Sequence, residues 1–104
     1  MHYLGGLTGG GMLMYGNREI VRVSYDFDGF RRPSLEVVGT GEITFPLNSL
    51  KDVFGLDVQV RTDDGRILKL KFSEKTLGPE ANVAHVDVSG DLPRFDQHWR
   101  RWDH

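Results

Sequence analysis

The sequence predicts a mainly β protein, a small six-stranded antiparallel barrel or sandwich with a short internal helix and a C-terminal helix. Apolar and polar residues alternate with a period of two along much of the chain, which is typical of half-buried strands. Turn-forming residues separate these segments at short intervals, as they do in antiparallel β domains. The length of 104 residues matches one domain. The pattern does not separate a barrel from a sandwich, so both architectures stay open.

The N-terminal segment is rich in glycine, with five glycines between Gly5 and Gly11. Glycine loses more conformational freedom on folding than any other residue, so regular structure here is entropically expensive. We therefore expect residues 1–11 to form a flexible glycine-rich arm. Residues 12–104 are expected to form a single β domain that includes the C-terminal helix.

A short segment, Met12 to Tyr15, follows the arm, and after Gly16-Asn17 two long strands are expected. Apolar residues alternate with polar ones from Val21 to Phe27, and again from residue 35 to residue 45. Between them, Asp28-Gly29 is predicted to start a turn that Pro33 closes. Gly39 and Gly41 fall on the apolar face of the second strand, where a missing side chain lets a sheet bend sharply. This placement favours a barrel corner.

A short helix is expected after Pro46. Ser49 followed by Asp52 resembles a helix start, and Gly55 stands where a helix would stop. Leu50, Val53 and Phe54 would share one face of this helix. We expect one or two helical turns.

The clearest hairpin signal joins the strands expected at 56–61 and 68–72. A three-residue loop ending at Gly65 sets Val60 opposite Leu68, whereas a two-residue loop would set Val60 opposite Lys69. Only the first register keeps apolar residues on one face. Such loops place a left-handed residue last, so Gly65 is predicted to have a positive φ.

A sixth strand and a terminal helix complete the expected fold. Ala84, Val86 and Val88 alternate with polar residues, and Pro93 ends the strand. The segment from 94 to 104 then places its aromatic residues on one helical stripe. A helix of this length needs a packing partner, because nucleation is unfavourable in a short helix.

Charge and cysteine content exclude several function classes. Thirteen Lys and Arg stand against fifteen Asp and Glu, so there is no overall positive field for nucleic acid or anionic lipid. The chain has no cysteine, which removes disulfides and thiolate metal sites. The first fifteen residues contain no Lys or Arg and are too short to span a bilayer. We expect no export signal and no membrane segment, and take a cytoplasmic location as the default.

The residues that most resemble a catalytic triad are His85, Asp87 and Ser89, which share one face of the sixth strand. Alternate residues of a strand stand about 7 Å apart, while a catalytic relay needs contacts of about 3 Å. We therefore expect three independent residues on a solvent face, and no catalytic residues. The four histidines are scattered, so we predict neither a metal site nor a cofactor.

The C-terminal segment is the candidate for partner binding, because it holds both tryptophans of the chain. It could be a lid on the β core or a contact surface, since Trp and Arg are enriched at binding hot spots. The candidate partner-binding residues are Phe95, Trp99, Arg100, Arg101 and Trp102.

The sequence is therefore interpreted as a non-catalytic β domain that acts through protein-protein contacts, with another protein or with a second copy of itself. Two alternatives stay open. One is a module that binds a small ligand or single-stranded nucleic acid on the barrel face, although the acidic balance disfavours nucleic acid. The other is an enzyme whose site is assembled from residues distant in sequence.

Overall fold

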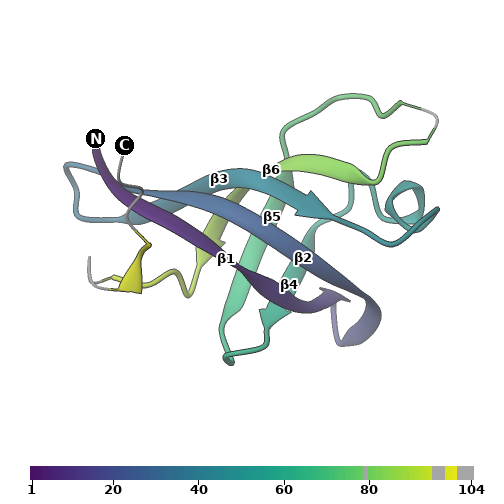
Figure 1. Cartoon of the computed structure of the whole chain (residues 1–104), viewed down its shortest axis with the longest axis horizontal. Coiled ribbons are helices and arrows are strands. Elements are labelled where there is room, and N and C mark those ends of the chain that lie inside the picture. Colours follow the sequence, from purple (N-terminus) through teal and green to yellow (C-terminus); the bar gives the residue numbers. More distant parts are fainter. Residues whose placement is uncertain (79, 95–97, 101–104) are drawn as a thin grey trace.

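The alternating segments form a closed antiparallel barrel of six strands (Figure 1). The computed structural model describes residues 1–78, 80–94 and 98–100. Its strands are β1 (His2–Tyr15), β2 (Arg18–Arg31), β3 (Val37–Thr44), β4 (Val58–Thr62), β5 (Ile67–Phe72) and β6 (Val83–Gly90). Their order around the barrel is β1-β2-β3-β6-β5-β4. The predicted β class is confirmed, and of the two architectures the barrel is the correct one. In the described part of the chain, no helix is both long and apolar enough to cross a membrane.

The core is made by side chains that alternate inward along the strands, as the period of two predicts. Burial of apolar surface supplies the main driving force for closing such a barrel. The strand residues of this core are Leu4, Leu13, Val23, Tyr25, Phe27, Ile43, Val58, Val60, Leu68, Leu70, Ala84, Val86 and Val88.

The glycine-rich segment forms most of β1, so the expected flexible arm is wrong. Its residues pair with β2 from His2 opposite Arg31 to Tyr15 opposite Arg18. Glycine suits this strand because neighbouring groups approach its backbone closely. A Cβ added at Gly11 would lie 2.6 Å from the carbonyl oxygen of Arg61, closer than any side chain can pack. Hydrogen bonding to a neighbouring strand thus offsets the loss of glycine conformational entropy, which was the reason to expect a flexible arm.

The expected C-terminal helix is not confirmed. Backbone N–H and C=O groups of Arg100 exchange hydrogen bonds of 2.8 and 2.7 Å with Gly6 of β1. Strand β1 pairs with β4 only from Gly11 to Met14, so the part of β1 before Gly11 has an edge that β4 does not cover. Arg100 is therefore extended, because it satisfies backbone groups on that edge. Among the expected tail residues, Phe95, Arg101 and Trp102 lie outside the described residues.

The internal helix has the lower of the two expected lengths and is not an α-helix. It is a single 3₁₀ turn, η1 (Leu50–Asp52), in which Leu50 is buried. The side chain of Ser49 does not cap η1 and instead donates a 2.7 Å hydrogen bond to the carbonyl of Pro46. Gly55 has φ +85°, as a residue that ends a helical turn often does.

Of the hairpin turns between neighbouring strands, those of β2–β3 and β4–β5 were predicted in detail, and only one follows the prediction. In the β4–β5 hairpin, Val60 lies opposite Leu68 and Gly65 has φ +91°, so the three-residue loop is confirmed. In the β2–β3 hairpin, the expected turn at Asp28-Gly29 is wrong, because β2 continues to Arg31. The loop is Pro33 to Leu35 instead, and Leu35 is exposed where the pattern placed it on the buried face.

Candidate functional site

A groove of about 580 Å³ lies on the outer face of the barrel. We call it the outer groove. It lies over β3, β5 and β6, and the end of β2 forms one side of it. Its lining residues include Met1, Phe30, Arg32, Glu36, Val38, Thr40, Lys69, Lys71, Asp87 and Ser89. A volume of this size is within the range of binding pockets in proteins.

The floor of the outer groove carries apolar side chains on a face that should be polar. Phe30 and Val38 lie opposite each other on β2 and β3, and both are partly buried. The ring of Phe30 also packs against Tyr3, with ring centroids 5.4 Å apart. The sequence offered one signal for this floor, because Val38 interrupts an otherwise polar outer face of its strand.

Charged groups of both signs surround that floor. Asp87 lies opposite Lys71, and Ser89 lies opposite Lys69, across the β5–β6 pair. All four side chains are exposed. Within the described part of the chain, Lys69 and Lys71 take part in no ion pair with a carboxylate. These ammonium groups are therefore available to an incoming molecule.

His85, Asp87 and Ser89 are all exposed on β6, as expected for a solvent face. The ring of His85 lies beside two carboxylates, with Nδ1 3.4 Å from Glu74 Oε1 and Nε2 3.7 Å from Glu42 Oε1. It is held by these groups and not by Ser89. The described residues contain no cluster of His, Asp and Glu that could hold a metal ion.

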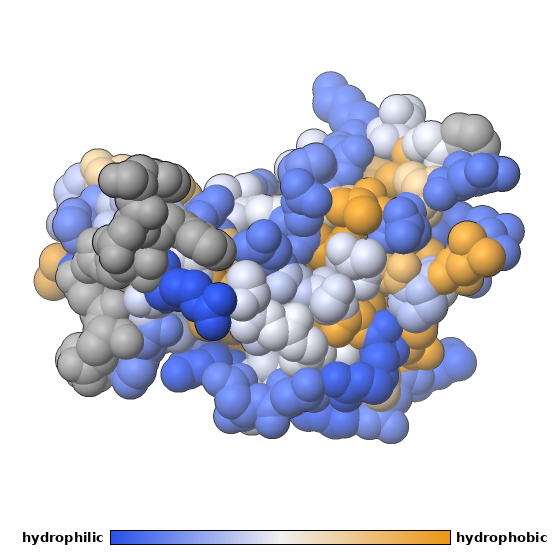
Figure 2. All heavy atoms as spheres, in the orientation of Figure 1, coloured by the Kyte–Doolittle hydropathy of each residue, from blue (hydrophilic) through white to orange (hydrophobic). Residues whose placement is uncertain are grey.

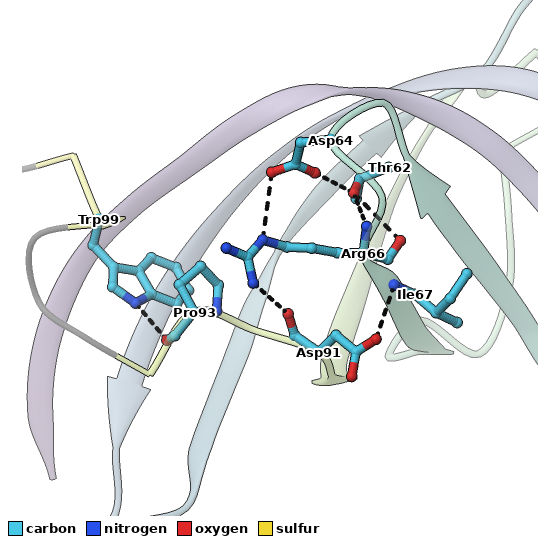
Figure 3. Close-up of polar contacts among 7 residues, drawn as sticks. All are labelled: Thr62, Asp64, Arg66, Ile67, Asp91, Pro93 and Trp99. Carbon is cyan, nitrogen blue, oxygen red and sulfur yellow. Dashed lines mark hydrogen bonds and ion pairs between the residues drawn. The ribbon is translucent and has the colours of Figure 1, made fainter.

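Trp99 lies in the core, which fits the lid alternative for the C-terminal segment. Its side chain is only 3% exposed, and its indole Nε1–H donates a 2.9 Å hydrogen bond to the carbonyl of Pro93 (Figure 3). Burial of the ring with its polar atom satisfied is what a lid residue requires. Arg100, by contrast, has an exposed side chain.

A polar network fixes the chain that leads from β6 toward Trp99 (Figure 3). Arg66 donates a 3.1 Å hydrogen bond to the carbonyl of Asp91, and the Asp91 carboxylate accepts one of 3.3 Å from the Ile67 N–H. The buried hydroxyl of Thr62 accepts a 2.8 Å hydrogen bond from the Arg66 N–H. The turn of the β4–β5 hairpin therefore anchors the segment after β6, which makes this network structural.

A second apolar area lies at the other end of the barrel. Figure 2 shows apolar residues reaching the surface toward the right, the end where Figure 1 places the loop that contains η1. Leu47 in that loop is 80% exposed. It does not line the outer groove, so it serves below as a comparison position.

Comparison with protein-family models, with curated proteins and with solved structures finds no match. The chain is thus defined by its fold, a closed six-stranded antiparallel barrel. Its function has to be argued from the surface that the barrel presents.

Proposed function

We propose that the chain is a non-catalytic β-barrel domain that binds another protein chain through the outer groove. The observation that carries this proposal is the pairing of an apolar floor, Phe30 and Val38, with a charged rim. Protein interfaces have this anatomy, with an apolar centre that loses its water and a polar border that sets orientation. The proposed contact surface is the groove, and Trp99 takes no part in it, because that side chain is buried.

The charges of the rim favour a protein partner over nucleic acid. Single-stranded nucleic acid binds best where cations alone line the path of its phosphates. Here Glu36 and Asp87 line the same groove as Lys69 and Lys71. Carboxylates would repel phosphate, whereas a protein surface can offer groups of both signs to match them.

Selection from a displayed library of random peptides tests the proposal. Peptides that bind the full chain are measured again with Val38→Glu, which places a charge on the groove floor. We expect affinity to fall by about tenfold or more, as it does at an interface hot spot. Ile20→Glu is the matched control, because Ile20 is a partly exposed apolar residue of β2 that does not line the groove.

The control should retain the affinity of the unmodified chain, and circular dichroism should show that both variants keep the β fold. The proposal is wrong if the library yields no binder. It is also wrong if the selected peptides bind Val38→Glu as tightly as they bind the unmodified chain.

A further inference from the structure

Leu35 occupies a backbone position suited to glycine. In the β2–β3 turn, the Leu35 N–H donates a 2.8 Å hydrogen bond to the carbonyl of Arg32. In the β4–β5 turn, the Gly65 N–H donates a 3.0 Å hydrogen bond to the carbonyl of Thr62. Both residues are left-handed, with φ +72° for Leu35 and φ +91° for Gly65. The two turns thus share one conformation, and leucine is the strained choice for it.

The side chain of Leu35 gains nothing from its own fold that would offset this strain. It is 76% exposed, so its apolar surface remains in water. Strained backbone positions cluster at binding and switch sites, where the strain serves a purpose other than stability. Contact with a second molecule would remove this leucine from water and account for it.

The turn that carries Leu35 stands at the edge of the outer groove. Arg32 and Glu36 flank the loop, are joined by a 2.9 Å backbone hydrogen bond, and both line the groove. Met1 lines the groove as well, and it borders a smaller hollow together with Leu35. A projecting apolar side chain therefore lies directly beside an apolar hollow. This arrangement is self-complementary. When two copies are related by a twofold axis that passes between Leu35 and the outer groove, the Leu35 side chain of each copy enters the groove of the other.

The charges around the groove fit the same arrangement. The turn contributes Arg32 and Glu36, and the opposite side of the groove contributes Asp87, Lys69 and Lys71. When the turn of one copy enters the groove of another, Glu36 can meet the lysines and Arg32 can meet Asp87. A surface of a single sign would repel its own copy, whereas this one carries both signs.

We infer that the occupant of the outer groove is a second copy of this chain, with Leu35 of each copy seated in the groove of the other. The inference rests on the proposed function, since it names the partner for the same groove. It commits to a twofold dimer in which the β2–β3 turn is the inserted element.

Cysteine crosslinking tests the geometry, because the natural sequence contains no cysteine and every crosslink comes from an introduced one. Leu35→Cys is mixed with a tagged Ser89→Cys chain under mild oxidation, and mixed disulfide dimers are identified by mass. Ser89 is exposed and lines the groove. Leu47→Cys, equally exposed but outside the groove, replaces Leu35→Cys in the control. We expect about tenfold more mixed dimer with Leu35→Cys, because a disulfide requires the two backbones to approach closely.

Sedimentation equilibrium gives the second readout. The unmodified chain should associate to a dimer, and Leu35→Gly should raise the dissociation constant by about tenfold or more. Glycine keeps the turn conformation, so loss of association in this variant would not reflect unfolding. The inference is overturned if the unmodified chain is monomeric at high concentration, if Leu35→Gly associates as tightly, or if Leu47→Cys crosslinks equally well.

The failure of this inference can be told from the failure of the proposed function. A monomeric chain whose selected peptides still depend on Val38 would exclude the dimer and leave protein binding in the groove intact. Peptide binding that ignores Val38→Glu would remove the proposed function itself.

Discussion

The indole ring of Trp99 occupies the space that a side chain at Gly29 would fill. A Cβ added at Gly29 would lie 2.3 Å from Cη2 of that ring. Gly29 pairs with Gly5 on β1 and with Gly39 on β3, so three glycines lie in a row across three strands. Of the three, Gly29 leaves the space in which the aromatic ring packs directly on backbone, while Gly5 faces Cβ of Trp99 and the carbonyl oxygen of Arg100.

Removing the ring from this space should destabilise the barrel. Trp99→Ala is expected to lower the free energy of unfolding by about 3–5 kcal/mol, the usual cost of truncating a buried aromatic residue. Arg100→Ala is the control, because Arg100 contributes backbone hydrogen bonds and its side chain is exposed. It should change the free energy by about 0.5 kcal/mol or less. Urea denaturation measures both, and equal effects would contradict the lid role of Trp99.

A methyl group at position 29 should lower the free energy of unfolding only while the indole ring of Trp99 is present. Gly29→Ala forces the ring or the strand to shift and should cost about 1–3 kcal/mol, as overpacking does. In the Trp99→Ala background the same change should cost much less, because the space is vacant. A double-mutant cycle measures this coupling. The same cost in both backgrounds would show that strand geometry, and not the ring, requires glycine here.

The strained turn gives a prediction on stability that is separate from association. Leu35→Gly should raise the free energy of unfolding by up to about 1 kcal/mol, since relief of left-handed strain exceeds the entropy that glycine adds to the unfolded chain. The reverse change, Gly65→Leu, should lower it by about 1–2 kcal/mol. Dilute samples keep association out of the measurement. A Leu35→Gly variant less stable than the parent would show that Leu35 supports its own fold.

The exposed polar residues of β6 should act independently of one another. Replacing His85, Asp87 or Ser89 singly by alanine should change the free energy of unfolding by only a few tenths of a kcal/mol. The three effects should add in the triple variant. A triple variant that loses far more than the sum would indicate a coupled set and reopen the enzyme interpretation.

The Arg22–Asp63 ion pair predicts a small dependence of stability on pH. The Arg22 guanidinium donates a 2.8 Å hydrogen bond to Asp63 and lowers the pKa of that carboxyl from its ordinary value of 3.8. The folded pKa is below the unfolded one, so the stabilisation is present above the unfolded value and is lost as pH falls through the folded value. Both side chains are 59% exposed, and salt should weaken the effect.

Arg22→Gln tests this pair. The pKa of Asp63, followed by NMR of its carboxyl carbon, should rise toward its ordinary value in the variant. The loss of stability in acid should also become shallower. An unchanged Asp63 titration would mean that the ion pair is not maintained in solution.

Sequence patterns correctly predicted the structural features that depend on residues close together in the chain. The Gly65 turn and the register of Val60 with Leu68 follow from turn chemistry and the faces of two adjacent strands. The prediction for the segment from Gly5 to Gly11 was wrong because its glycines give no alternating pattern, although pairing with β2 holds it as a strand. The burial of Trp99 fits the lid alternative, but its position over Gly29 was not predicted, because the two residues are far apart in the chain. Local patterns carry no information about such partners.

The sequence contained a signal for only part of the outer groove. Val38 departs from the polar pattern of its strand, but nothing in the sequence brings Phe30, Lys69 and Asp87 to the same surface. The strand order supplies that juxtaposition, because β6 lies between β3 and β5. Leu35 was assigned to the core because period-two alternation continues through a loop in which the backbone is not extended.

The bridge between Gly6 and Arg100 has a consequence for the time course of folding. Hairpins β1–β2, β2–β3 and β4–β5 join neighbouring segments, so their loops are short and close early. The bridge joins residues at nearly opposite ends of the sequence, and closing so large a loop is entropically unfavourable until other contacts hold the ends close. The barrel should therefore acquire its hairpins first and seat Trp99 last. Refolding followed by tryptophan fluorescence should then lag behind the formation of β structure.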